Sequence, residues 1–323
     1  MVQLVVNSMN RRKFVALAAA APFGLRAALA AASRVPNALV TCDEQSCLAV
    51  VDLASFRIVR RVTTPAAPRA IELVGSRAVV AHWTLGSLSI VDAHRVLHVV
   101  EGLEEPRYTA AHPDGVHAFV SDSSYGIAVV DVQRGRIVGR VKLPGWPRHV
   151  SLDPSGRALW VGLGTSSTQV AVVDVSDPRR PRREALLTPP FLAHDVGVSA
   201  DGRQVWVTSG TSDRTATYVR GRKLRATLAA DAAPQHVTFG DAVAYVTSGH
   251  SGTLRVHSLA DGGLLRTTPI PVGSYNVQYG HGRVLTPSLS RGTLAILSAG
   301  GELLASVPVS SSCHDACFAP ALP

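Results

Sequence analysis

The chain has 323 residues, of which 46% are hydrophobic, 5% aromatic and 17% charged, and its formal net charge is +9. The apolar content excludes a disordered chain, and 27 glycines and 20 prolines are too few for a collagen-like or low-complexity one. No run of about eighteen uncharged apolar residues occurs, so the sequence predicts no clean membrane span.

The first 32 residues have the order of an export signal. A basic run, residues 11–14 (RRKF), precedes an alanine-rich apolar stretch, and small residues at 28–32 provide cleavage sites. The paired arginines resemble a twin-arginine signal. A proline, a glycine and an arginine within residues 22–26 interrupt the apolar stretch, which disfavours the alternative of an uncleaved membrane anchor.

These features predict a signal peptide over residues 1–32, a single domain over residues 33–323, and a periplasmic or extracellular location. The start codon is left open between Met1 and Met9, because Met9 immediately precedes the signal-like segment. The signal holds four basic residues and no acidic one, so the rest of the chain carries only +5. Its main basic cluster, residues 179–183, is typical of a solvated loop, and we predict no nucleic-acid partner.

A short apolar strand followed by a polar residue recurs along the rest of the chain. The copies are 38 to 46 residues apart, and they end at Asp52, Asp92, Asp131, Asp174, Arg220, Ser258 and Ser298. A second motif, such as PRYTAA or PRHVSL, precedes each copy except the first, and Asp-Gly or Ser-Gly hairpin signals follow it. Units of about 40 residues with four short strands have the length of a propeller blade. We therefore predict an all-β, seven-bladed β-propeller of four-stranded antiparallel blades.

The sequence of the repeats also resembles that of the YVTN-repeat β-propellers. The nearest matches are Pro147 to Val161, His194 to Thr208 and Pro234 to Thr247, and the resemblance covers the chain after the signal. It implies the propeller fold but no particular function, because such propellers serve as scaffolds, ligand binders and enzymes.

The order of the strands predicts how the ring closes. The first unit lacks its innermost strand and starts with NALVTC, whereas an unpartnered innermost strand, CHDACF, occurs at residues 313–318. The C-terminal strand should therefore complete the blade that the N-terminal strands begin, which removes an open sheet edge.

All four cysteines, Cys42, Cys47, Cys313 and Cys317, belong to this closing blade. An exported location permits disulfides, and antiparallel register places both Cys47 and Cys313 opposite Cys42. All three connectivities stay open. The alternatives are free thiols or a metal or redox site with His314, although the sequence has no CxxC pair. We assign no metal and no cofactor from the sequence.

The second motif brings one polar residue per blade to a common end of the central channel. These residues are Arg69, Arg107, Arg148, His194, Gln235, Tyr275 and His314, and the next positions are Ala70, Tyr108, His149, Asp195, His236, Asn276 and Asp315. Strand alternation allows only one of the two rings to point fully into the channel. Three guanidiniums on consecutive blades suit a carboxylate or phosphate, so Arg69, Arg107, Arg148 and Tyr275 are candidate ligand-binding residues.

The sequence contains no nucleophile elbow, P-loop, zincin motif or dinucleotide fingerprint. We therefore predict a monomeric binding or scaffold module of the cell envelope that takes a small anionic ligand or an envelope protein at the channel mouth. The alternative is a periplasmic propeller enzyme, a lactonase-like hydrolase or a metal- or cofactor-assisted oxidoreductase. Its candidate catalytic groups are His194, His314, Asp195 and Asp315, which could relay protons.

Overall fold

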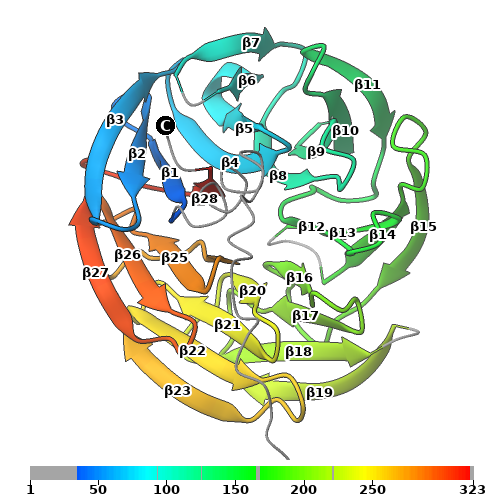
Figure 1. Cartoon of the computed structure of the whole chain (residues 1–323). Coiled ribbons are helices and arrows are strands. Elements are labelled where there is room, and N and C mark those ends of the chain that lie inside the picture. The colour runs from blue at the N-terminus through cyan, green and yellow to red at the C-terminus, as the bar shows by residue number, and fades with distance from the viewer. Residues whose placement is uncertain (1–34, 93, 125, 165–167, 220–221, 321–323) are drawn as a thin grey trace, which may run out of the picture. The chain divides into compact units, whose positions relative to one another are not determined.

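The computed structural model describes residues 35–92, 94–124, 126–164, 168–219 and 222–320. The predicted signal peptide and Arg220 lie outside the described residues. Residues Pro36–Pro323 form one compact unit, in which seven four-stranded antiparallel sheets are arranged as the blades of a ring (Figure 1). The described residues contain no α-helix and one 3-10 helix, η1 (Trp83–Leu85), and no helix among them is long and apolar enough to cross a bilayer. The predicted fold is confirmed.

The strands follow the chain blade by blade. The closing blade contains, from the channel outward, β28 (Ala316–Ala319), β1 (Asn37–Cys42), β2 (Cys47–Asp52) and β3 (Arg57–Thr63). The next three blades contain β4 (Pro68–Val74), β5 (Arg77–His82), β6 (Ser87–Val91), β7 (Val96–Val100), β8 (Pro106–Ala111), β9 (His117–Asp122), β10 (Gly126–Asp131), β11 (Arg136–Val141), β12 (Val150–Leu152), β13 (Ala158–Gly162), β14 (Val170–Asp174) and β15 (Arg182–Leu187). The last three contain β16 (Val196–Val198), β17 (Gln204–Thr208), β18 (Arg214–Val219), β19 (Lys223–Ala229), β20 (Val237–Phe239), β21 (Val243–Ser248), β22 (Thr253–Ser258), β23 (Leu264–Pro269), β24 (Gln278–Gly280), β25 (Arg283–Pro287), β26 (Thr293–Ser298) and β27 (Leu303–Pro308).

The ring closes as the strand order predicts. Strand β28 pairs antiparallel with β1, with Asn37 opposite Ala319 and Val40 opposite Ala316. The Thr41 amide extends the pairing by donating to the Asp315 carbonyl at 2.9 Å. Segments about 280 residues apart in the sequence thus share one sheet. Because β1 and β28 pair with each other, the inner edge of β1 is not left open.

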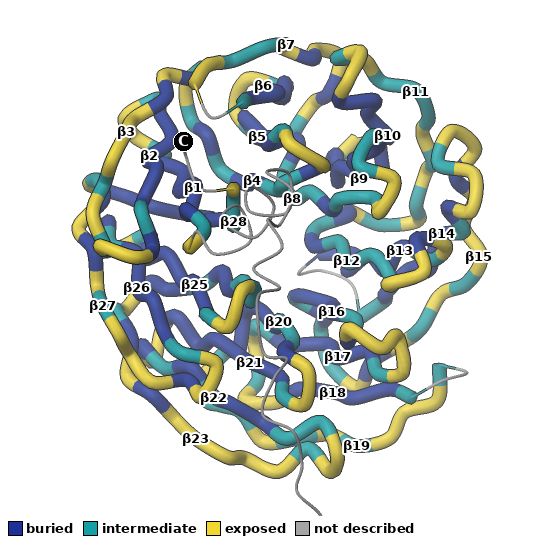
Figure 2. Tube along the Cα trace, in the orientation of Figure 1, coloured by how far each residue is buried: buried dark blue, intermediate teal, exposed yellow. Residues whose placement is uncertain are grey.

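The core lies between the blades rather than within one central cluster. Side chains alternate between the two faces of each strand, so each sheet packs against both of its neighbours. Seven buried apolar clusters result, one between each pair of adjacent blades. The middle strands are the most deeply buried: every residue of β10 is buried, whereas only Val62 of β3 is (Figure 2). The outer strands therefore form the exposed circumference.

The recurring Asp has a local structural role. Its carboxylate accepts hydrogen bonds from backbone amides two and three residues later, as Asp52 does from Ala54 and Ser55 at 2.6 and 3.2 Å. This Asx turn leads the chain from the third strand of a blade to its outer strand. Where the repeat has Ser258 instead, its hydroxyl accepts from the Ala260 amide at 3.2 Å. The degenerate copy thus keeps the turn.

Candidate functional site

Three arginines meet at one end of the channel, where the innermost strands begin. Arg69 and Arg107 lie at the starts of β4 and β8, and Arg148 lies two residues before β12. The guanidinium carbon of Arg69 lies 4.9 Å from the ring centroid of Trp83, and that of Arg107 lies 5.3 Å from the same centroid. Arg107 also lies 4.6 Å from the ring of Trp146. These cation–π contacts hold two of the three guanidiniums in place at the mouth.

Two carboxylates accompany the three arginines. Asp43 lies 3.7 Å from Arg69, and Glu105 lies 3.6 Å from Arg107. No ion pair involving Arg148 is present among the described residues. The pKa of Arg107 is lowered chiefly by burial, and also by the charges of Arg148 and Arg69, although Glu105 opposes this. The arginines therefore repel one another electrostatically, and the three of them outnumber their two acidic partners.

Two of these guanidiniums have an unsatisfied group. The Nε atoms of Arg107 and Arg148 are buried and have no hydrogen-bond partner in the structure. A buried N–H without an acceptor is destabilising by about 1–3 kcal/mol, so an incoming acceptor would gain from filling this position. Burial also raises the pKa of Asp43 to about 7 despite the opposing effect of Arg69, which weakens the negative charge at the mouth near neutral pH.

The second ring, rather than the first, points into the channel. Its members Tyr108, His149, Asp195, His236, Asn276 and Asp315 line a cavity of about 250 Å³. Residues two positions further on, including Glu72, Ser151 and Thr238, line the same cavity, as the alternation of an extended strand requires. Burial and the nearby Asp315 raise the pKa of Glu72 to about 8.

The two aspartates of this ring join neighbouring blades. Asp195 accepts from the amides of Val196 at 2.7 Å and Val237 at 3.0 Å. Asp315 accepts from the amides of Ala316 at 2.9 Å and Ile71 at 3.0 Å. Each carboxylate thus links its own strand to the innermost strand of the next blade. The negative charges beside the arginines come instead from Asp43 and Glu105, two residues that the sequence repeat did not single out.

Four histidines and a tyrosine meet below the arginines. The Tyr108 ring lies 3.7 Å from that of His149, 5.6 Å from that of His236 and 6.2 Å from that of His314, centroid to centroid. The pKa values of His149, His194 and His314 are lowered well below the ordinary value, chiefly by burial and also by nearby positive charges such as Arg148. These imidazoles are therefore neutral at pH 7.

The sequence predicts functional roles for His194 and His314, and the structure treats them differently. His314 Nδ1 lies 3.1 Å from the carbonyl oxygen of Arg69, so its ring is tied to the next blade. His194 instead faces the rings of His149 and His236, at 4.9 and 5.7 Å. His149 and His236 thus belong to the same group as His194.

Tyr275, a predicted ligand-binding residue, lies apart from the arginines. Its ring makes an edge contact with His250 at 5.4 Å and packs over Gly249, where a Cβ atom would lie 2.3 Å from the ring. The neighbouring Gln235 accepts a hydrogen bond from the Gly249 amide at 2.8 Å. This side of the mouth is held together by packing, and the arginine side carries the charge.

The cysteines divide into two groups. Cys42 and Cys47 lie opposite each other in register, and together with Cys313 they are buried in the cluster between the closing and seventh blades. Cys317 lies in the cluster on the other face of the sheet. All four are free thiols in the structure. A disulfide from Cys42 to Cys47 or Cys313 stays a prediction.

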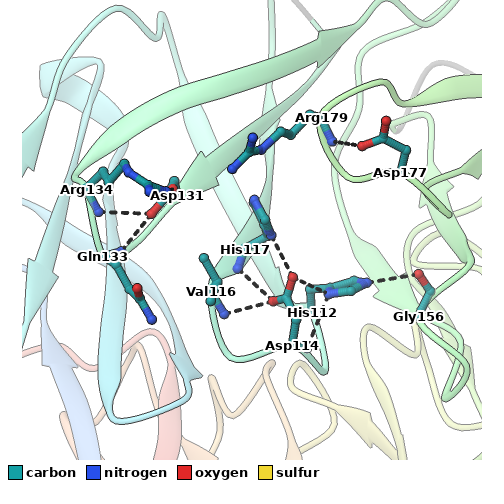
Figure 3. Close-up of polar contacts among 10 residues, drawn as sticks. All are labelled: His112, Asp114, Val116, His117, Asp131, Gln133, Arg134, Gly156, Asp177 and Arg179. Carbon is teal, nitrogen blue, oxygen red and sulfur yellow. Dashed lines mark hydrogen bonds and ion pairs between the residues drawn. The ribbon is translucent and has the colours of Figure 1, made fainter.

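A second group of potential metal ligands lies in the turn between β8 and β9, at the opposite end of the strands. The side chains of His112, Asp114 and His117 approach one another within 4.8 Å (Figure 3). Asp114 accepts from His117 Nδ1 at 2.7 Å and from the amides of Val116 and His117, and His112 Nε2 lies 3.1 Å from the Gly156 carbonyl. Most of these atoms are satisfied within a hydrogen-bonded turn, and Nε2 of His117 alone in the group is buried without a hydrogen-bond partner in the described part of the chain.

Comparison with known proteins supports the fold. No family model and no curated protein matches the chain. Among solved structures, hydrazine synthase from Kuenenia stuttgartiensis aligns with a TM-score of 0.73 and 16% identity, over 82% of this chain and 92% of that one. A functionally unknown protein from Desulfotomaculum acetoxidans DSM 771 aligns with a TM-score of 0.72 and 10% identity, over 88% and 99% of the two chains. At such identities the likeness concerns the fold alone, and membership of the YVTN-repeat family stays a prediction.

Proposed function

We propose that this protein is an exported binding module whose channel mouth takes a small anionic ligand, a carboxylate or a phosphate compound, between Arg69, Arg107 and Arg148. The observation that carries the proposal is the unsatisfied charge of the mouth. Three guanidiniums face two carboxylates, and the buried Nε groups of Arg107 and Arg148 lack an acceptor. An oxyanion can accept from several guanidinium N–H groups at once and offset their repulsion.

The surroundings favour a small anion over an extended apolar ligand. Trp83 and Trp146 restrict the guanidiniums from the side, and the buried histidines close the mouth from below. Because His149, His194 and His314 are neutral, the arginines supply the positive charge. Partial exclusion of water strengthens the attraction between a guanidinium and an anion.

Titration calorimetry of purified protein with inorganic phosphate, sulfate and succinate tests the proposal. We expect saturable binding of at least one of them, with affinity falling as the salt concentration rises, because screening weakens the attraction. A matching rise in melting temperature should accompany binding. If none of these anions binds or raises the melting temperature at low salt, the proposal is wrong.

Export has its own test. Replacing Arg11 and Arg12 with lysine should block export if the leader is a twin-arginine signal, and the exported protein should begin after the small residues near position 30 or 32. Normal export of the variant would favour the general secretory route instead.

A further inference from the structure

We propose that His149, His194 and His236 together bind one late first-row transition-metal ion, such as Zn²⁺ or Cu²⁺, beneath the arginine mouth. The three residues come from consecutive blades and lie one or two residues before the innermost strands β12, β16 and β20. One ligand atom from each lies within 4.8 Å of the others. Nitrogen atoms around tetrahedral zinc are about 3.4 Å apart, given bond lengths of about 2.0–2.1 Å, so a modest inward rotation of the rings would complete the site.

His149 has the hydrogen bonding of a metal ligand. Its Nδ1 lies 2.6 Å from the His194 carbonyl oxygen and donates to it, which leaves Nε2 as the nitrogen with the lone pair. This Nε2 is buried without any hydrogen-bond partner, and the residue as a whole is only 2% exposed. A buried acceptor that faces two further imidazoles and has no donor to satisfy it is the position that a metal ion would fill.

His236 is oriented in a similar way. Its Nδ1 lies 3.4 Å from Asp195 Oδ2, and the amides of Val196 and Val237 fix that carboxylate. A carboxylate or a backbone carbonyl on the far nitrogen of a ligating histidine sets its tautomer and raises its basicity, and both kinds of partner occur here. This interaction directs Nε2 of His236 to a metal.

The position of His194 depends on a glycine. A Cβ atom at Gly210, whose φ is +62°, would lie 2.5 Å from Nδ1 of His194 and 2.7 Å from its Cβ. The ring therefore occupies space that any other residue at position 210 would take. No hydrogen bond of the His194 side chain occurs among the described residues, so its ring nitrogens are not committed to another partner.

The donor set selects the class of metal. Three imidazoles suit Zn²⁺, Cu²⁺ and their neighbours, whereas Mg²⁺ and Ca²⁺ prefer oxygen ligands. Arg148 opposes a cation at this place, but the Asp195 carboxylate lies 3.4 Å from Nδ1 of His236 and favours one. The cavity leaves room for water or an anion in the fourth coordination position.

The test uses the full chain, purified without an affinity tag and stripped with a chelator. Titration with Zn²⁺ by calorimetry and with Co²⁺ by absorption should show one equivalent bound. His149→Ala and His236→Ala should each weaken binding at least about tenfold. His98→Ala, at an exposed site on β7, and His112→Ala, in the other histidine group, are matched controls that should bind as the wild type does.

A measurement on the wild type keeps the proposal testable if a variant fails to fold. Electron paramagnetic resonance of the Cu²⁺-loaded protein should show nitrogen hyperfine coupling from three imidazoles. Absence of saturable binding, fewer than two coupled nitrogens, or binding that only His112→Ala removes would each overturn the proposal. The result is separable from the anion proposal. Arg148→Gln should preserve metal binding, because it removes a positive charge beside the histidines, and it should weaken phosphate binding by the metal-free protein.

Discussion

Replacing Arg148 with glutamine tests the central electrostatic argument. Among the three arginines of the mouth, Arg148 is the one without a carboxylate partner or a tryptophan contact in the described residues, and its Nε is buried and unsatisfied. The side chain therefore contributes little to stability and much to the positive potential. Glutamine keeps a polar side chain of comparable length and removes only the charge and the guanidinium geometry.

The expected loss of affinity follows from one charge-assisted hydrogen bond. Such a bond contributes about 1.5–3 kcal/mol, so the dissociation constant for phosphate should rise by roughly 10- to 100-fold. The melting temperature of the unliganded protein should stay constant or rise slightly, because the variant removes a buried unsatisfied N–H and the repulsion that Arg107 experiences. Loss of affinity without loss of stability separates binding from a structural role.

The assay is titration calorimetry with phosphate at low and at physiological salt. Arg136→Gln is the matched control, because it makes the same change in net charge at an exposed position on the outer strand β11. The control should lower affinity by less than about twofold, since screening suppresses charges more than about 10 Å from the ligand. Equal effects of the two variants would show that only net charge matters, and wild-type affinity in Arg148→Gln would refute the anion site.

Three further predictions concern titration and closure. Sulfate affinity should increase as pH falls from about 8 to 6, because Asp43, with a pKa of about 7, loses its negative charge beside Arg69; calorimetry across this range should show the increase in the wild type and a flatter profile in Asp43→Asn. Burial raises the pKa of Glu72 from 4.5 to about 8, so its ionisation lowers stability as pH rises through that interval. Glu72→Gln should therefore raise the free energy of unfolding by roughly 1–3 kcal/mol at pH 9 and leave it unchanged at pH 4, as denaturant titrations would reveal, and an equal effect at both pH values would contradict the assignment. Ending the chain at Ser311 removes β28, which should make the protein insoluble or sharply less stable; a truncated form that melts like the full chain would refute the closure.

The fold was predictable because its determinants are local and repeated. The Asp after the third strand in four of the units and the hairpin dipeptides specify turns at a regular spacing, and seven similar units can bury their faces only against one another. The closure of the ring was predictable because the first unit lacks its innermost strand and the C-terminal segment supplies an additional one. At the departures the hydroxyl is also an acceptor: Ser258 accepts from the amide two residues later, as the carboxylate does, and Ser298 accepts from the Glu302 amide.

The site was only partly predictable. Symmetry brought Arg69, Arg107 and Arg148 to one rim, but their partners Asp43 and Glu105 come from connecting segments whose paths the strand pattern does not fix. The sequence also left open which ring faces the channel. That depends on the register of each innermost strand with its neighbour, and hence on hydrogen bonds such as that between Asp195 and the Val237 amide, which no single repeat contains.

The histidine group shows the same limit. Each of His149, His194 and His236 has an ordinary place in its own blade, and only the ring places one ligand atom from each within 4.8 Å of the others. The signal that could have identified them is the recurrence of histidine in three consecutive units, at the second-ring position for His149 and His236 and one position earlier for His194. A side chain that is structural in one blade becomes part of a site when its neighbours carry the same residue type.

The pairing of β28 with β1 also sets the order in which the molecule can assemble. Every other strand pair joins neighbours in sequence, so six blades can form while the chain is still being synthesised, but the closing blade must wait for residues about 280 positions later. Contacts of such separation form late and slowly, and until then β1 presents an unpaired edge. At high concentration, the β28 strand of one molecule can reach that edge in another before its own ring closes. The expected by-product of refolding is therefore a strand-exchanged dimer, which dilution during refolding should suppress.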